Sequence, residues 1–496
     1  MNLRRSTLVT VAVPLLFAAC SSDDSGNGAA PPFGSTTPSA QPTDGVQTPP
    51  ESPPEVPVTP TPDPDVAGSD SNEGQNPGTP LEQPIENPVA GSGTSEGTPP
   101  EADPGTPLVP SVPVENRGAD CVVPDLPPGN TLPSSTMLPD PFTRLDGTRL
   151  TQKSDWTCRR EEILQQVYQY IYGEKPTAPD SVTGTVSNTQ ISVNIQHNGQ
   201  NGSFTVAVQT PNGPGPFPAV VSFGGSGPAA IMRGMGVATI NFNFQQAVGG
   251  AGEGLFGRLY GNSSAGDLAA WAWGASRILD VIYASDSSVI DASRLAVTGC
   301  SFMGKAAFAA GALDERFTLV VPLESGIGGV PSYKIVPQLE PNPGNAGDGP
   351  EQPQHAKNSG WLPLSSLVND FNRLPVDTHE IIGLVAPRGL LILGNNGTQG
   401  QYYRNLDFRS EYATAIAGRE IFSALGVAAN ISYDSRAVDH CQNMDRFTAA
   451  IQASVDRFLL GGTSTTGEFT TDWEGIRTDP DPYIDWTTPT LEGELP

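Results

Sequence analysis

Basic residues and histidines are scarce in this chain of 496 residues. Lysine and arginine together number 26 against 53 aspartates and glutamates, and the formal net charge at pH 7 is −27. Proteins that bind nucleic acid bring clustered lysines and arginines to the phosphates, so this composition argues against a nucleic-acid partner. The four histidines offer no two at ligand spacing. We therefore expect neither a metal site nor a cofactor.

Long hydrophobic runs are also missing after residue 20, so no later segment is expected to span a bilayer. The first twenty residues have the plan of an export signal, with Arg4 and Arg5 before an apolar stretch that ends in small residues. The ending Leu16–Cys20 resembles a bacterial lipobox, in which the cysteine is lipidated. We expect Cys20 to anchor a cell-surface protein, at the outer membrane of a bacterium. The alternative is a signal peptide cleaved elsewhere, which leaves a soluble, secreted protein.

Residues 21–120 contain 22 prolines and 16 acidic residues, and Arg117 is their one basic residue. Such a composition buries too little apolar surface to offset the conformational entropy of the chain. We expect 21–120 to be a disordered, extended tether. Residues 121–496 hold all the tryptophans and tyrosines and are long enough for one large domain, which we expect to be monomeric.

Without the anchor cysteine, four of the five cysteines remain, and an even number in an exported protein favours two disulfides. Spacing leaves all three pairings open among Cys121, Cys158, Cys300 and Cys441. One pairing has a functional consequence, because Cys300 precedes Ser301 and Cys441 follows His440. A disulfide brings two Cα atoms to roughly 5.5 Å, so a Cys300–Cys441 bond would hold this serine and this histidine close together. Cys121 would then pair with Cys158.

Strand-like and helical patterns alternate along the domain. Alternating strands are expected at 182–186, 191–195 and 204–208, with Asn-Gly turns at Asn198 and Asn201. Apolar strands are expected at 219–223, 237–242, 295–298, 317–323 and 390–393, and helices at 156–172, 267–283, 303–313, 411–425 and 446–460. The alternation predicts an α/β fold, a three-layer sandwich in which helices cover both faces of a mostly parallel sheet.

Ser301 lies between a β-rich run and an alanine-rich helical run, in the segment LAVTGCSFMGKAAF. The α/β-hydrolases place their nucleophile at such a strand-to-helix turn, which exposes the hydroxyl and directs a helix N-terminus toward it. The usual G-x-S-x-G spacing is imperfect, because Gly299 is present but Met303 stands where the second glycine belongs. The alternative is an ordinary strand–helix junction with a buried serine.

A nucleophilic serine needs a histidine within hydrogen-bond reach and a carboxylate that sets the tautomer of the histidine. His440 follows a strand predicted at 430–433, near the end of the domain, whereas the other three histidines are expected to be structural or solvated. Glu324 follows the strand that ends at Leu323 and is favoured by elimination, since 394–396 after the next strand offer no carboxylate. Asp439 is disfavoured because it directly precedes the histidine. The alternative for Glu324 is a solvated loop acid.

Together these segments resemble the glucuronoyl esterases, carbohydrate esterase family 15 of the α/β-hydrolase superfamily. The family motifs G-C-S-R-x-G-K, E-S-G-x-G-G and His-Cys correspond to Gly299–Lys305, Glu324–Gly329 and His440–Cys441. Further similarity lies in Leu374–Leu391 and Ile484–Leu491, so the resemblance extends over nearly all of 121–491. It implies that the cysteine before the serine is bonded to the cysteine after the histidine.

The resemblance also implies an activity: hydrolysis of the ester between 4-O-methyl-glucuronate on xylan and lignin alcohols. Ser301 would attack the ester carbonyl, and His440 would take its proton and later give it to the leaving alcohol. Glu324 would stabilise the imidazolium. The implied partner is glucuronoxylan or a lignin–carbohydrate ester of the plant cell wall.

Four further residues are assigned by the resemblance. The amide of Phe302, directly after the serine, is the expected oxyanion donor. Lys305 matches a sugar-binding lysine of the family; without the resemblance it would be interpreted as a surface charge near a helix start. Tyr402 or Tyr403 would supply the aromatic ring that the family places near the sugar.

Two departures from the family affect the expected substrate. Members generally carry an arginine after the serine, where this chain has Phe302, and a tryptophan-arginine pair after the glycine turn, where it has Tyr333-Lys334. Losing one oxyanion donor costs on the order of 3 kcal/mol in the transition state. Three hypotheses remain: a glucuronoyl esterase, an esterase that uses the same triad on another uronate or carbohydrate ester, and a non-catalytic carbohydrate-binding lipoprotein.

Overall fold

The computed structural model describes residues 114–495 apart from Ser226, Ser287, 340–350, 364–369, 396–405, Asp407, 438–439, Asn443 and Trp473. The expected signal at 1–20 and the expected tether up to residue 113 lie outside the described residues. In the described part, no helix combines the length and apolarity that a membrane crossing requires.

A ten-stranded sheet organises the chain, with the strand order β1-β2-β3-β5-β4-β6-β7-β8-β9-β10. The first three strands form an antiparallel meander, and β3 pairs antiparallel with β5. Every pair from β5 to β10 is parallel, as the alternating pattern predicts. The strands are β1 (Ser181–Val186), β2 (Gln190–His197), β3 (Gln200–Gln209), β4 (Phe217–Phe223), β5 (Ala238–Phe242), β6 (Ile290–Cys300), β7 (Leu319–Leu323), β8 (Gly389–Asn395), β9 (Ile431–Ala437) and β10 (Phe469–Thr470).

All five expected helices are present, the first of them ending in a π-helical turn at Tyr168–Tyr172. The α-helices are α1 (Asp155–Val167), α2 (Gly227–Gly234), α3 (Phe244–Ala247), α4 (Gly254–Tyr260), α5 (Asp267–Ala284), α6 (Phe302–Leu313), α7 (Pro353–Asn358), α8 (Thr378–Val385), α9 (Phe408–Ala424) and α10 (Thr448–Leu459). The short helices α2, α3, α4 and α7 were not expected from the sequence pattern.

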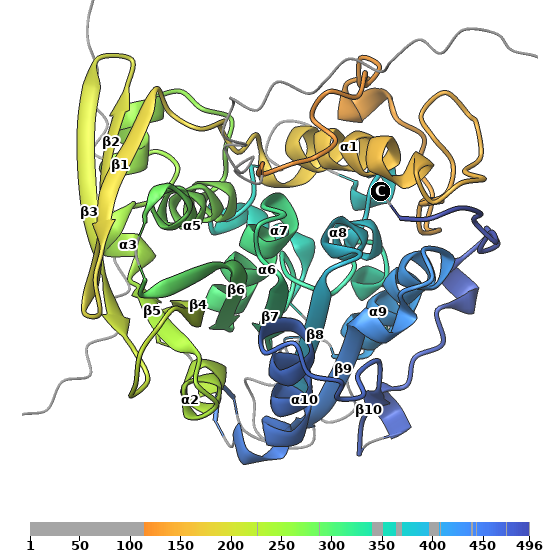
Figure 1. Cartoon of the computed structure of the whole chain (residues 1–496). Helices are drawn as coiled ribbons and strands as arrows, with labels where there is room; N and C mark the ends of the chain where they lie inside the picture. The colour runs from red at the N-terminus through yellow and green to blue at the C-terminus, as the bar shows by residue number, and fades with distance from the viewer. Residues whose placement is uncertain are drawn as a thin grey trace, which may run out of the picture. The chain divides into compact units, whose positions relative to one another are not determined.

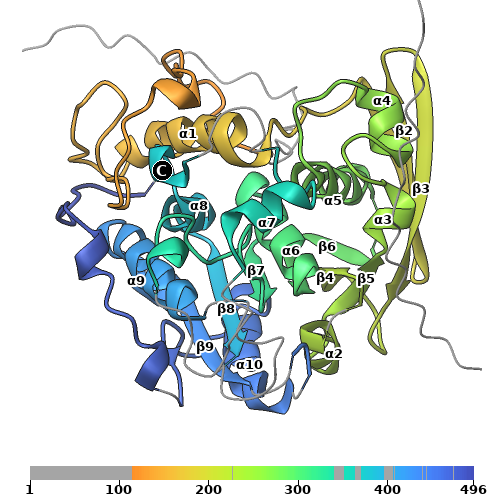
Figure 2. The same ribbon diagram turned by 180° about the vertical axis from the view of Figure 1, so that it is seen from behind.

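Helices cover both faces of the parallel part of the sheet (Figures 1 and 2). In β6 and β7, Ala296 and Val321 pack against α2 and α10, whereas Val297 and Val320 belong to the core that includes α5, α6 and α8. Successive side chains of a strand point to opposite faces, so a strand buried on both faces must be apolar throughout. This arrangement is the predicted three-layer α/β sandwich, and Figure 1 shows α2 and α10 on the side opposite α5, α6 and α8.

The described fold begins at Val114, before the boundary expected at Cys121. Glu115 forms ion pairs with Lys175 and Arg277, whose side chains are buried, and its carbonyl accepts a 2.8 Å hydrogen bond from the amide of Glu315. Arg117 pairs with Glu315 at 2.9 Å. The last residues assigned to the tether are therefore part of the folded domain.

One of the two expected Asn-Gly turns is confirmed and the other is wrong. Asn198 and Gly199 have φ values of +49° and +74°, as a tight hairpin turn between β2 and β3 requires. Asn201 and Gly202 instead lie inside β3. A Cβ atom at Gly202 would come within 2.1 Å of the Leu255 side chain, so this glycine makes room for α4 against the strand.

Candidate active site

The strand-to-helix turn at Ser301 is sharp. β6 ends at Cys300 and α6 begins at Phe302, so Ser301 alone makes the turn, with φ +59° and ψ −129°. Its amide donates to the carbonyl of Leu323 on β7 at 3.0 Å, and its carbonyl accepts from the amide of Lys305 at 3.1 Å. A left-handed φ at a non-glycine residue is a strained conformation that the surrounding structure must hold in place. The geometry is that of a nucleophile elbow.

Two glycines allow this turn, and they account for the imperfect spacing of the motif. A Cβ atom at Gly299 would lie 2.1 Å from the carbonyl oxygen of Met303, and one at Gly304 would lie 2.5 Å from that of Leu323. The helix α6 therefore comes closest to β7 at Gly304, so the second glycine is needed at position 304 and not at position 303. Met303 is tolerated because its side chain instead packs over Gly224, at the end of β4.

Glu324 and His440 meet at the carboxyl ends of β7 and β9. Glu324 is fully buried, with φ +46°, and its amide donates to the carbonyl of Leu393 at 2.7 Å. Its Oε2 atom is in hydrogen-bond contact with Nδ1 of His440. This contact fixes the proton on Nδ1 and leaves Nε2, on the far side of the ring, as the acceptor. The His440 side chain is 26% exposed, and Ser301 is also half-buried.

A disulfide joins the elbow to the histidine loop. Cys300 and Cys441 are bonded with their Cα atoms 5.9 Å apart, and they are the chain neighbours of Ser301 and His440. The second disulfide joins Cys121 to Cys158 on α1, with a Cα separation of 5.4 Å. The Cys300–Cys441 pairing is the one that the family resemblance implied, and Cys121–Cys158 is the pairing then left for the other two cysteines.

The same cluster could be mistaken for a metal site. Ligand-type atoms of Cys300, Glu324, His440 and Cys441 all lie within 4.8 Å of one another. A cysteine binds metal as a thiolate, however, and both sulfur atoms here are in a disulfide. The cluster therefore leaves one carboxylate and one imidazole, which is too few donors for a structural zinc site.

The other three histidines lie elsewhere. His379 is buried on α8, where its Nε2 atom lies 2.9 Å from the carbonyl oxygen of Pro139. His197 stacks on Tyr260 at the hairpin turn. His355 is exposed on α7. Only His440 is brought to the elbow, as the sequence argument predicted.

Lys305 lies on the β7 side of the elbow, covered by two residues that the sequence argument missed. Its ammonium donates to the carbonyl of Ser325 at 2.7 Å and pairs with Glu351 at 2.9 Å. The ring of Trp361 lies 4.9 Å from Nζ. Burial lowers the pKa of Lys305, and the Glu351 carboxylate opposes this shift. Lys305 itself is only 2% exposed, so Glu351 and Trp361 form the accessible surface of this cluster.

Phe302 occupies an aromatic environment. Its ring packs edge-on against Phe244 at 6.0 Å and Trp271 at 6.3 Å between centroids. Lys334 is buried elsewhere, with its ammonium donating to the carbonyls of Ser135 and Asn372. It therefore does not replace the cation that the family has next to the serine. Tyr402 and Tyr403 lie outside the described residues.

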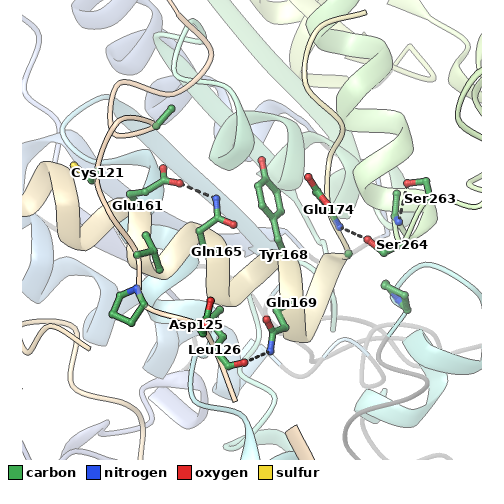
Figure 3. Close-up of a pocket in the computed structure, with 16 residues that line it drawn as sticks. Cys121, Asp125, Leu126, Glu161, Gln165, Tyr168, Gln169, Glu174, Ser263 and Ser264 are labelled. Atoms are coloured by element: carbon green, nitrogen blue, oxygen red, sulfur yellow. Dashed lines mark hydrogen bonds between the residues drawn. The ribbon is translucent and has the colours of Figure 1, made fainter. Parts of the chain in front are cut away.

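A cavity of about 900 Å³ lies away from the catalytic residues. Figure 3 shows Gln165, Tyr168 and Gln169 along one of its walls and Glu174 and Ser264 along another. Neither Ser301, Glu324 nor His440 lines it. This cavity is therefore not the site of the triad.

Comparison with known proteins agrees with the geometry. The family profile described as "Glucuronyl esterase, fungi" matches residues 193–426. A 4-O-methyl-glucuronoyl methylesterase of Podospora anserina is 38% identical over 368 residues, which cover 72% of this chain and 74% of the relative. The chain belongs to the glucuronoyl esterase family. It is a carboxylic ester hydrolase.

Solved structures of the family share its fold. The glucuronoyl esterase catalytic domain of Hypocrea jecorina matches with a TM-score of 0.66 and 33% identity, over 74% of this chain and all of that domain. A variant of the Sporotrichum thermophile glucuronoyl esterase, in complex with methyl 4-O-methyl-beta-D-glucopyranuronate, matches with a TM-score of 0.67 and 34% identity, over 75% of this chain and all of that one. The α/β-hydrolase fold expected from the elbow is confirmed.

Proposed function

We propose that this esterase cleaves esters of 4-O-methyl-glucuronate, with Ser301 as nucleophile, His440 as general base and acid, and Glu324 as the carboxylate that orients the histidine. The observation that carries the proposal is the contact between Glu324 Oε2 and His440 Nδ1, because a disulfide ties this histidine to the elbow at Ser301. Similarity to named 4-O-methyl-glucuronoyl methylesterases supports the acyl group.

The reaction has two halves. His440 Nε2 takes the hydroxyl proton as Ser301 Oγ adds to the ester carbonyl carbon; the tetrahedral intermediate then collapses, the bond to the alkoxy oxygen breaks, and the imidazolium gives its proton to the leaving alcohol. Water then adds to the acyl-serine with the same base, and the carboxylic acid and the free serine are released. Glu324 stabilises the imidazolium in both halves.

The oxyanion is proposed to form at the N-terminus of α6. The amide of Phe302 is free of an intrahelical partner by its position as the first residue of the helix, and the helix N-terminus favours negative charge. The glycine pair Gly224-Gly225 at the end of β4 borders the same place and has positive φ at both residues. The amide of Gly224 donates to the carbonyl of Phe242 at 3.3 Å, so the Gly225 backbone is the part of the pair that is proposed to supply the second side of the oxyanion hole.

The uronate is proposed to bind on the β7 side of the elbow. Glu351 offers a carboxylate that accepts hydrogen bonds from sugar hydroxyls, and Trp361 offers a ring face for the apolar face of the sugar. Lys305, which the family resemblance assigns to the sugar, is proposed to act through Glu351, whose carboxylate it holds in place by their ion pair.

The physiological substrate is proposed to be the ester between glucuronoxylan and lignin alcohols, in the plant cell wall. We propose further that the protein is exported and held at the cell surface by a lipid on Cys20. The two disulfides support an oxidising compartment. Separation of the membrane fraction from the soluble fraction of cells that express the wild type or Cys20→Ala tests the anchor. We expect the wild type in the membrane fraction and the variant in the soluble fraction. Equal release of the two proteins into the soluble fraction contradicts the anchor.

A second candidate is an esterase that uses the same triad on another uronate. The observation that favours it is Phe302, because an aromatic ring stands where the family has a cation. The discriminating experiment compares methyl and benzyl esters of glucuronate and 4-O-methyl-glucuronate with methyl galacturonate, using wild type and Ser301→Ala. We expect the 4-O-methyl-glucuronate esters to give the highest kcat/KM and the variant to lose activity on all of them. Higher kcat/KM on the galacturonate ester selects the second candidate.

A further inference from the structure

The cavity of about 900 Å³ beside α1 has no role in the proposed reaction. We call it the α1 cavity. Gln165, Tyr168 and Gln169 form one of its walls, and Glu174 and Ser264 form another (Figure 3). Its volume lies within the range of about 300–1,000 Å³ that ligand-binding clefts have. Tyr168 and Gln169 also belong to the π-helical turn Tyr168–Tyr172, and such turns occur frequently at functional sites.

The wall on α1 presents hydrogen-bond acceptors that are already held in place. The side-chain amide of Gln165 donates to Glu161 Oε1 at 2.7 Å. That of Gln169 donates to the carbonyls of Leu126 and Pro127 at 3.2 and 3.0 Å. Because each NH₂ group is bonded to the protein, each glutamine is oriented and its carbonyl oxygen remains as an acceptor. Such oriented acceptors favour a ligand that carries O–H groups, since less side-chain entropy is lost on binding.

Hydroxyl groups supply the donors of the cavity. Ser264 Oγ accepts from the amide of Glu174 at 3.2 Å, and Ser263 Oγ accepts from the amide of Ala265 at 3.1 Å. The hydroxyl proton of each serine is therefore available to a ligand. The Tyr168 hydroxyl makes no hydrogen bond to the other residues drawn in Figure 3, and burial raises its pKa, so it keeps its proton. Sugar hydroxyls, which both donate and accept, match these groups.

The charge of the lining argues against an anionic ligand. Asp125, Glu161 and Glu174 line the cavity, and the described residues of the lining include no lysine, arginine or histidine. These carboxylates repel a free uronate but leave a neutral sugar unaffected. Pro363 and the ring of Tyr168 add apolar surface for the C–H face of a sugar ring.

The α1 cavity lies beside the sugar side of the elbow, because one segment borders both. Trp361 lies over Lys305, and Pro363, two residues later, lines the cavity. The same segment packs against Gly266, where a Cβ atom would lie 2.6 Å from Cδ of Pro363. A glycan in the cavity is therefore held alongside the catalytic site and not in it.

We propose that the α1 cavity is a second, non-catalytic binding site, which takes an uncharged stretch of a polysaccharide main chain built from neutral pentose or hexose units. The inference goes beyond the proposed function, because this binding needs neither the ester nor the triad. It gives the enzyme a hold on a polysaccharide that is independent of the uronate. The main chain of xylan and cellulose both present this chemistry, and the test distinguishes them.

The test measures binding of xylohexaose and cellohexaose, which carry no uronate and no ester, to the whole protein by isothermal titration calorimetry. A double variant, Gln165→Ala with Gln169→Ala, removes the acceptors of one wall. Ser264→Trp fills the cavity from another wall, which guards against a folding defect of a single variant. Gln190→Ala on β2 and Ser423→Trp on α9 change exposed residues of the same kinds elsewhere and are the matched controls.

We expect the wild type to bind at least one hexasaccharide saturably, both cavity variants to raise Kd about tenfold or more, and both controls to keep the wild-type Kd. Glu351→Ala, on the sugar side of the elbow, should also keep it. The cavity variants should hydrolyse the methyl ester of 4-O-methyl-glucuronate with the kcat/KM of the wild type. Tighter binding of xylohexaose identifies xylan as the source, and tighter binding of cellohexaose identifies cellulose.

A wild type that binds neither hexasaccharide saturably overturns the site. A Kd that Glu351→Ala raises and the cavity variants leave unchanged also overturns it, because the glycan then lies on the sugar side of the elbow. If spermine binds in the cavity and the hexasaccharides do not, the carboxylates serve a cation and the proposal fails. A wild type that binds the hexasaccharides through the cavity but hydrolyses no glucuronate ester contradicts the proposed function alone.

Discussion

The amide of Cys441 donates a hydrogen bond of 3.1 Å to Oε2 of Glu324, the same carboxylate oxygen that contacts His440 Nδ1. Cys441 also has a left-handed φ of +56° and is bonded through sulfur to Cys300. One residue therefore orients the acid through its backbone and attaches the histidine loop to the elbow through its side chain. The position of the imidazole depends on both links.

The first prediction concerns the three proposed catalytic residues. Ser301→Ala and His440→Ala each remove a participant in proton transfer, and Glu324→Gln leaves the histidine without its tautomer-setting carboxylate. We expect each variant to lower kcat by about 10⁴-fold on a benzyl glucuronate ester. Steady-state kinetics measure the effect, and a single-turnover experiment shows whether acylation is the lost step.

The control for this prediction is a buried carboxylate away from the site. Glu162 is buried among Arg144 and Arg159, so Glu162→Gln changes a charge of the same kind without touching the elbow. We expect it to lower the melting temperature and leave kcat near that of the wild type. A Ser301→Ala variant that keeps wild-type kcat would remove the serine mechanism.

The second prediction separates the two disulfides. They close loops with sequence separations of 141 and 37 residues, for which chain entropy gives contributions of about 5 and about 4 kcal/mol to the free energy of unfolding. We expect the double variant at Cys300 and Cys441 to lose kcat as well as stability, because the histidine loop is no longer held at the elbow. The double variant at Cys121 and Cys158 should lose stability only.

The measurement is kcat of both double variants at a temperature where circular dichroism shows that both are folded. Partial reduction of the wild type that opens the Cys300–Cys441 bond alone offers the same comparison without mutation. Full kcat with the Cys300–Cys441 bond shown to be open contradicts the positioning role.

The site residues that could be predicted from the sequence lie at the ends of strands. Ser301, Glu324 and His440 could be found because each follows a strand, and the carboxyl ends of parallel strands meet at one edge of a sheet. The Cys300–Cys441 pairing came from the family resemblance, because spacing left all three pairings open. Buried strands and long helices were also predictable, because their hydrophobic period is set by burial.

The missed parts depend on contacts between distant segments. Glu351 and Trp361 belong to an insertion whose position over Lys305 is set by packing and not by any periodic pattern. Gly202 reads as a turn residue, yet it serves to admit Leu255 against β3. Short helices such as α2 gain their stability from tertiary packing, so their sequences carry little signal.

The third prediction concerns the residue after the nucleophile. Phe302→Arg places a cation beside the developing oxyanion, and a donor at such a place is worth about a hundredfold in rate. We expect kcat on the methyl ester to rise by about 10- to 100-fold. Phe302→Leu, which removes the ring without adding charge, is the matched variant and should show no rise. A Phe302→Arg variant that is no faster than Phe302→Leu contradicts an electrostatic role for this position.

The fourth prediction concerns the start of the domain. Burial raises the pKa of Glu115, but the cations of Lys175 and Arg277 outweigh it and hold the pKa below its usual value. Glu115→Ala leaves the buried Lys175 without its carboxylate partner, whereas Arg277 keeps Asp280, and the loss costs about 3–5 kcal/mol in the free energy of unfolding. A chain that starts at Cys121 should lose about as much relative to one that starts at Val114. Equal melting curves for the two chains contradict the assignment of these residues to the fold.

The last prediction is a pH dependence of stability that comes from His379. Burial lowers its pKa from 6.5 to about 4, and the ring lies against Trp486 with Nε2 bonded to the Pro139 carbonyl. Between pH 6.5 and 4 the unfolded chain binds a proton on this residue that the folded chain does not, so the free energy of unfolding falls as pH is lowered through that window, by up to about 3 kcal/mol. Burial raises the pKa of the neighbouring Glu380 to about 7, so this residue makes the free energy of unfolding rise as pH is lowered from 7 to 4.5. Wild type and a His379→Gln variant both keep Glu380, so its contribution is the same in the two proteins. We therefore expect urea unfolding of His379→Gln to show a smaller loss of stability between pH 6.5 and 4 than the wild type, and parallel curves for the two proteins would show that His379 does not carry the effect.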